Sequence, residues 1–138
     1  MGILMASGLV RLKNRADFLR VAAKGRRAVR AGFILQAVRC PAEADGGEAI
    51  RVGFTASRKV GNAVIRNRAK RRLRAVAAEV LTRSGKPGTD YVIVARSTIG
   101  DRAYAELVVD LETALRQVGR LPVDHPLGGD GPRRGEDI

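Results

Sequence analysis

One segment of the chain concentrates side chains that bind anions. It spans Ser57–Arg74 and reads SRKVGNAVIRNRAKRRLR, and residues 56–74 hold eight Lys or Arg and no acidic residue. Planar guanidinium groups bind phosphate through paired hydrogen bonds and stack on bases. An asparagine amide such as that of Asn67 can reach base edges or 2′-hydroxyls. These residue types predict contact with a polyanion.

Placed on a helix, this segment combines one apolar stripe with a basic surface. At about 100° per residue, the stripe expected to pack on a sheet holds Ile65, Ala69, Leu73, Val76 and Val80. The polar residues fall on one flank (Arg66, Lys70, Arg74), on the other flank (Arg68, Arg72) and on the far side (Asn67, Arg71). A solvated helix usually relieves like charges with acidic residues at i±4. Their absence favours binding, with a merely solubilising helix as the alternative.

The side chains that a protein nuclease would need are missing from the pattern. Such enzymes use paired His or Lys groups, or a carboxylate cluster that holds metal. The sole histidine, His125, lies between two prolines near the end of the chain, and no P-loop or zinc spacing is present. Cys40 is alone, which suits a buried small residue and a reducing cytoplasm. Any bond cleavage must therefore be performed by another component.

The charge of the whole chain supports a polyanionic partner. The 138 residues carry a net charge of +12. Residues 1–40 hold nine basic residues and one acid, whereas residues 75–138 hold eight basic and ten acidic residues. The basic surface is therefore expected from the first half. An anionic membrane would need a lipid anchor or a bulkier apolar face, and no run approaches a membrane span. A ribosomal or general RNA-binding protein and a helix-based DNA binder remain alternatives.

The hydrophobic pattern predicts one α/β domain. Asn14 should cap a first helix that ends at Gly25, and residues 26–30 should begin an edge strand. Phe33–Cys40 alternates as a strand. The acidic turn at 41–48 is expected to join that strand to the next one in a hairpin.

The second half predicts two helices around a buried strand. Ile50–Ser57 should form a strand, and a long helix should run from a cap at Asn62 to about Arg83. Tyr91–Ala95 is apolar on both faces and should be a central strand. Thr98 or Asp101 should begin a last helix that ends at Gly119.

At the basic segment the sequence resembles a known family. The run Arg66-Asn67-Arg68 within GNAVIRNRAKRRLR resembles the RNR signature of the bacterial ribonuclease P protein component. Three further stretches resemble the same family: Arg11–Val21 (RLKNRADFLRV), Arg51–Ala63 (RVGFTASRKVGNA) and Asp90–Arg96 (DYVIVAR). The resemblance covers about residues 10–118.

The resemblance implies a fold and two RNA-binding surfaces. The fold is a single two-layer α+β domain of the ribosomal-protein-S5-domain-2-like type, ordered α-β-β-β-α-β-α with a left-handed βαβ crossover. The residues that match the RNA-docking helix and its approach are Lys59, Asn62, Arg66, Asn67, Arg68, Lys70, Arg71 and Arg74. The residues that match the cleft for the 5′ leader of precursor tRNA are Arg11, Lys13, Phe18, Ile34 and Gln36. For Phe18, ordinary core packing is the alternative.

The resemblance also implies a division of labour. The catalytic RNA performs Mg²⁺-dependent removal of the leader, and the protein assists without being the catalyst. The expected partners are this RNA and the precursor tRNA leader, with no membrane, no obligate protein partner and no metal held by the protein. Residues 1–10 and 120–138 are expected to be a flexible arm and tail around a domain at 11–119.

Overall fold

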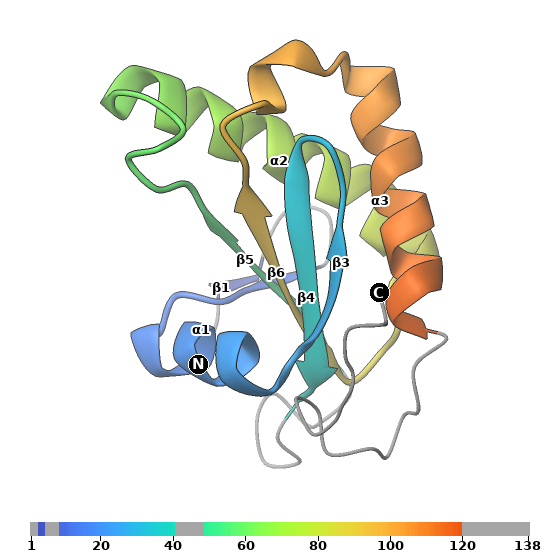
Figure 1. The fold of residues 1–138 in the computed structure, drawn as a ribbon. Coiled ribbons are helices and arrows are strands. Elements are labelled where there is room, and N and C mark those ends of the chain that lie inside the picture. Colours follow the sequence, from blue (N-terminus) through green and yellow to red (C-terminus); the bar gives the residue numbers. More distant parts are fainter. Residues whose placement is uncertain (1–2, 5–8, 41–48, 120–138) are drawn as a thin grey trace.

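The computed structural model describes residues 3–4, 9–40 and 49–119. Two strands, a short helix and three further strands precede the long helix, and one strand, a 3-10 turn and a last helix follow it (Figure 1). The strands are β1 (Ile3–Leu4), β2 (Val10–Arg11), β3 (Arg26–Val29), β4 (Phe33–Arg39), β5 (Ile50–Thr55) and β6 (Thr89–Ala95). The helices are α1 (Arg15–Lys24), α2 (Ala63–Ser84), the 3-10 turn η2 (Ile99–Asp101) and α3 (Tyr104–Gly119).

The strands form one mixed sheet in the order β1-β2-β5-β6-β4-β3. The strand β6 is central, as predicted, and pairs parallel with β5 and antiparallel with β4. The expected hairpin between β4 and β5 is wrong, because β6 lies between these two strands. The chain passes from β5 to β6 through α2, which lies behind the sheet in Figure 1 and makes this crossover left-handed.

The sheet separates two hydrophobic layers. The larger core lies between the sheet and the helices α2 and α3, and includes Phe33, Leu35, Leu73 and Ile93. A smaller cluster of Leu12, Val21, Val38 and Val92 lies between the opposite face and α1, with Phe18 packed against it. The alternation predicted for Phe33–Cys40 is thus confirmed in β4, since successive residues enter different layers.

The helix ends follow the predicted caps. The side chain of Asn14 accepts a hydrogen bond from Ala16 N at 2.8 Å, and α1 ends at Gly25. Asn62 likewise accepts from Ile65 N at 3.0 Å, and α2 ends at Gly85. The last helix begins later than predicted. Residues 99–101 form a 3-10 turn, and α3 starts at Tyr104.

Part of the expected N-terminal arm is attached to the sheet. The strand β1 pairs antiparallel with β2, and β2 pairs parallel with β5. Leu9 is buried in the larger core. Residues 1–2, 5–8 and 120–138 lie outside the described residues, as does the acidic turn at 41–48. The flexibility of the arm and tail therefore stays a prediction.

Candidate nucleic-acid interface

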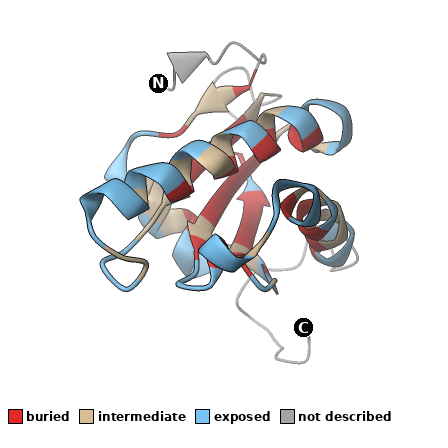
Figure 2. Ribbon diagram, turned by 90° about the horizontal axis from the view of Figure 1, so that it is seen from above, coloured by how far each residue is buried: buried red, intermediate tan, exposed pale blue. Residues whose placement is uncertain are grey.

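A line of exposed side chains, most of them polar, runs along the outer face of α2. Asn67, Arg68 and Arg71 are all exposed, and Val64 begins the same line one turn earlier. These positions are spaced i, i+3, i+4 and i+7, so they share one helix face. Figure 2 shows the long helix exposed on its outer side and buried on the side that meets the sheet. The predicted far side of the basic helix is therefore open to a ligand.

The inner stripe of α2 is buried as predicted, except at its first residue. Ala69, Leu73, Val76 and Val80 are buried, but Ile65 is 47% exposed. The prediction that Ile65 packs on the sheet is wrong, because this first turn of α2 lies beyond the part of the helix that is buried. The first turn of α2 contains no acidic residue.

Two arginines of α2 already bind carbonyl groups within the protein. Arg66 Nη1 donates to Gly61 O at 2.9 Å and holds the turn that precedes the helix. Arg72 Nη1 donates to Ile99 O at 3.0 Å, and its Nη2 donates to Arg102 O. Arg72 thus anchors η2 and is not free to contact RNA, whereas Arg66 keeps its other donors.

The remaining predicted residues of this surface differ in exposure. Lys59 is exposed, whereas Lys70 and Arg74 are half-buried along the flank of Arg66. The side-chain oxygen of Asn62 is occupied by the helix cap. The predicted set therefore lies on one end of α2 and the turn before it, with Arg68 and Arg71 presenting the most accessible guanidinium groups.

The opposite face of the sheet carries the second candidate surface. The ring of Phe18 on α1 lies over Gly53 of β5, where an added Cβ would lie 2.5 Å from its Cζ atom. Phe18 packs against the small cluster but stays half-buried. One side of this ring is thus fixed by packing, and part of it remains available to a ligand.

The strand register places a half-open apolar row beside Phe18. Thr55, Val94, Ile34 and Val29 are successive partners across β5, β6, β4 and β3. Three of them are half-buried and Val29 is exposed. The helix α1 covers the adjacent part of this sheet face but does not extend over this row. The row therefore remains accessible. Sequence reasoning missed Val29, Val94 and Thr55, which only the strand order could identify.

The structure brings together three of the five residues predicted for this cleft. Phe18, Ile34 and Gln36 lie on the α1 face, with Gln36 buried in the row next to Ile34. Arg11 is paired with Val52 and alternates with Leu12, so it lies on the opposite face. Lys13 is exposed between β2 and α1. Strand alternation therefore removes Arg11 from the cleft.

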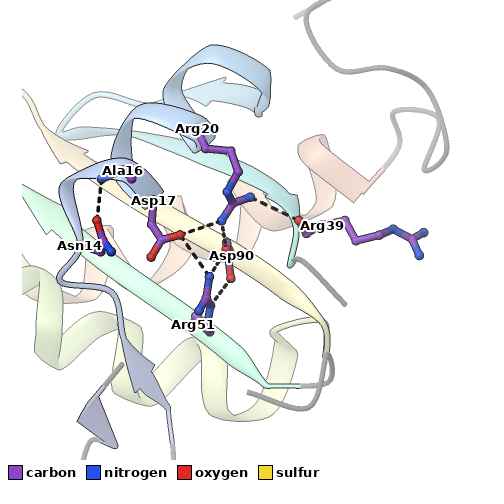
Figure 3. Close-up of polar contacts among 7 residues, drawn as sticks. All are labelled: Asn14, Ala16, Asp17, Arg20, Arg39, Arg51 and Asp90. Carbon is purple, nitrogen blue, oxygen red and sulfur yellow. Dashed lines mark hydrogen bonds and ion pairs between the residues drawn. The ribbon is translucent and has the colours of Figure 1, made fainter. Parts of the chain in front are cut away.

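A buried cluster of charges fastens α1 to the sheet (Figure 3). Arg51 donates to Asp90 through Nε at 2.7 Å and Nη2 at 2.8 Å. Arg20 on α1 donates to the same carboxylate. Oδ1 of Asp17 lies 3.4 Å from Nη2 of Arg20 and 3.5 Å from Nη2 of Arg51. Four side chains from α1, β5 and β6 thus form one network under the helix that carries Phe18.

Electrostatics keep the central carboxylate of this cluster ionised. Burial alone would raise the pKa of Asp90, but hydrogen bonds from Arg51 and Arg20 outweigh it and lower the pKa below its ordinary value. Burial raises the pKa of the nearby Cys40 thiol. The one acid in an otherwise apolar strand was the sequence signal for this network, and sequence analysis did not use it.

Known proteins resemble this chain over most of its length. A family model described as Ribonuclease P matches residues 7–119. The chain belongs to the ribonuclease P protein family. The ribonuclease P protein component of Paramagnetospirillum magneticum is 48% identical over 121 residues, which cover 88% of this chain and 91% of that protein. That of Ruegeria pomeroyi is 48% identical over 119 residues, covering 84% and 91%.

A solved structure of the ribonuclease P family confirms the fold. The Staphylococcus aureus RNase P protein superimposes with a TM-score of 0.63 at 29% identity, covering 77% of this chain and 92% of that one. The predicted single α+β domain and the predicted family are thus confirmed. Membership associates the chain with tRNA processing and with the ribonuclease P RNA.

Within residues 3–4, 9–40 and 49–119, no group of three or more His, Cys, Asp or Glu side chains could hold a metal ion. Over the same residues, none of the helices combines the length and apolar character needed to cross a membrane.

Proposed function

We propose that this chain is the protein subunit of a ribonuclease P holoenzyme that removes the 5′ leader from precursor tRNA. The observation that carries the proposal is the exposed line of Asn67, Arg68 and Arg71 on an α2 helix whose first three turns lack acids. Each guanidinium on this line can replace counterions on a phosphate. The catalytic RNA is the proposed occupant of this surface.

The leader of the precursor is the proposed occupant of the second surface. The half-buried ring of Phe18 offers a stacking platform, which is worth about 1–3 kcal/mol per base. The accessible row of Thr55, Val94, Ile34 and Val29 lies beside this ring and crosses the sheet. An unpaired strand has exposed base faces that suit a ring beside an apolar strip.

The protein's proposed contribution is positioning and charge screening. Phosphodiester hydrolysis takes place at Mg²⁺ bound by the RNA subunit, and the protein holds the leader so that the scissile bond meets that site. The same screening lowers the Mg²⁺ concentration that the RNA needs. The protein is therefore part of an endoribonuclease without supplying the reacting groups.

Cleavage at low Mg²⁺ tests the proposal directly. Precursor tRNA is incubated with a bacterial ribonuclease P RNA, with and without the full-length chain, and the 5′ end of the product is mapped. We expect the protein to restore cleavage at the mature 5′ end and to be inactive alone. If the RNA gains nothing from the protein, the chain is a general or ribosomal RNA-binding protein and the proposal fails.

A further inference from the structure

The basic surface of α2 begins with an apolar tip. Val64 is 75% exposed, more than any other large hydrophobic side chain in the described part of the chain. Its neighbour Ile65 is 47% exposed. Single exposed apolar residues are normal on protein surfaces. Here Val64 stands at the head of the line formed by Asn67, Arg68 and Arg71, and Ile65 follows it at the exposed end of the inner stripe.

The local structure holds this tip rigidly. Asn62 caps the turn through Ile65 N, and Arg66 donates to Gly61 O at 2.9 Å. Gly61 has a φ of 152°, and an added Cβ there would lie 2.8 Å from Cγ2 of Ile65. Ile65 is thus seated against the backbone of the turn. Since valine is also stiff at χ1, the apolar pair loses little conformational entropy when it binds.

The chemistry of the tip selects the part of an RNA that it can contact. Methyl groups gain nothing from a phosphate, and bases stacked within an A-form helix are not accessible through its deep, narrow major groove. The flat face of an unstacked base is the large apolar surface that a structured RNA exposes in loops and bulges. The arginines one and two turns along would bind the phosphates that flank such a base.

We propose that Val64, at the tip next to Ile65, packs against an unstacked nucleobase of the ribonuclease P RNA. This inference rests on the proposed function, and it adds a contact that does not depend on charge. The apolar contact anchors the first turn of α2 on one nucleotide, whereas Arg68 and Arg71 bind any phosphate backbone. The tip therefore contributes selectivity for a structured RNA over a plain duplex.

Salt dependence separates this contact from the electrostatic ones. We would measure the Kd of the full-length chain for a bacterial ribonuclease P RNA over a series of KCl concentrations. Val64→Ala removes two methyl groups' worth of buried surface and should weaken binding about five- to tenfold at every salt concentration. The slope of log K against log salt should stay at the wild-type value, because no phosphate contact is lost.

Three further variants make the result specific. Val64→Thr keeps the shape, replaces a methyl by a hydroxyl, and should also weaken binding with an unchanged slope. Arg68→Gln should reduce the slope by about 0.7–0.9. Val109→Ala is the matched control, because Val109 is a 58% exposed helical valine on α3, away from the basic line. It should bind within about twofold of wild type. Alanine favours helix, so Val64→Ala should fold normally.

The possible outcomes distinguish the inference from the proposed function. If wild type binds with an Arg68-dependent slope but Val64→Ala matches Val109→Ala, the nucleobase contact is wrong and the proposed function stands. If Val64→Ala lowers the slope as Arg68→Gln does, the tip acts through the charges and the inference also fails. If the wild-type chain dimerises without RNA and Val64→Ala does not, the tip binds a second copy of the chain and the inference fails. A wild type without selective RNA binding overturns the proposed function itself.

Discussion

Neutralising Asp90 should destabilise the fold strongly, because it would remove the carboxylate that accepts two hydrogen bonds from the buried Arg51. Asp90 is fully buried and the side chain of Arg51 is 4% exposed, so Arg51 has no route to water in the Asp90→Asn variant. Breaking a buried pair by removing one partner costs about 3–5 kcal/mol. Asp17 remains 3.5 Å from Arg51 and offsets part of that loss. We therefore expect the free energy of unfolding to fall by about 3 kcal/mol.

The chain offers a matched control on the other side of the sheet. Asp110 on α3 is also buried, and it accepts from Arg102 Nε and Nη2 at 3.1 Å each. Its arginine partners are more exposed, at 28% for Arg102 and 29% for Arg30, so both can turn to water. Asp110→Asn should therefore cost only about 1–2 kcal/mol.

Urea denaturation of the full-length chain at neutral pH measures both variants. Equal destabilisation by Asp110→Asn and Asp90→Asn would contradict the role assigned to the burial of Arg51. If Asp90→Asn does not fold, the double variant Arg51→Met/Asp90→Asn provides the test. Removing the buried guanidinium should recover part of the stability, since apolar replacements of buried ion pairs are often neutral. No recovery would contradict the proposed cause.

The pH dependence of the same variant has a defined sign. The pKa of Asp90 is lowered in the folded chain, so folding favours the ionised carboxylate. Its contribution is complete above the unfolded-state pKa of about 3.9 and is lost as the pH falls through the lower folded-state pKa. The stability gap between wild type and Asp90→Asn should be constant from neutral pH to about pH 5 and shrink below about pH 4. If the difference in stability between wild type and Asp90→Asn already shrinks near neutral pH, the pKa of Asp90 is not lowered in the folded chain.

Four other substitutions test the two candidate surfaces and the contacts that support them. Gly53→Ala should push the Phe18 ring away and lower stability by about 1–2 kcal/mol, seen as a lower Tm. Phe18→Leu should weaken binding of precursor tRNA about tenfold while leaving mature tRNA, which lacks a leader, unaffected in the holoenzyme; equal losses for both RNAs would remove Phe18 from the leader cleft. Arg72→Met should lower the Tm, because the carbonyl group of Ile99 loses its hydrogen bond, and should leave the salt slope of RNA binding unchanged. Arg71→Gln should leave the Tm unchanged and lower the salt slope.

The sequence predicted the elements better than their pairing. Capping residues such as Asn14 and Asn62 act within a few residues, so the helix starts followed from local rules. The order of strands depends on contacts far apart in sequence. A short turn after β4 favours a hairpin locally, but β6 competes for the same edge and pairs with β4 over seven residues. The left-handed crossover likewise came from the family resemblance and not from physical rules.

Periodicity predicted which basic residues of α2 are exposed, but not the contacts that they make. Helical periodicity placed Arg68 and Arg71 on the open side of α2, where they are exposed. It could not show that Arg72 is bound to η2. Nor could it show that the first turn of α2 is left uncovered, because both features depend on where η2 and α3 pack. Strand alternation would have placed Arg11 opposite Leu12, but only once β2 was known to pair with β5.

The connection between β5 and α2 links the two surfaces mechanically. Thr55 ends the accessible row on the sheet, and α2 begins at Ala63. The residues between are held by Val60 N donating to Ser57 O at 3.0 Å and by Lys59 N donating to the Ser57 hydroxyl at 3.3 Å. A rigid link fixes the basic line relative to the cleft. If the proposed function holds, an RNA bound along α2 therefore determines where a leader in the cleft lies, which is the geometric requirement for placing one scissile bond at a fixed site.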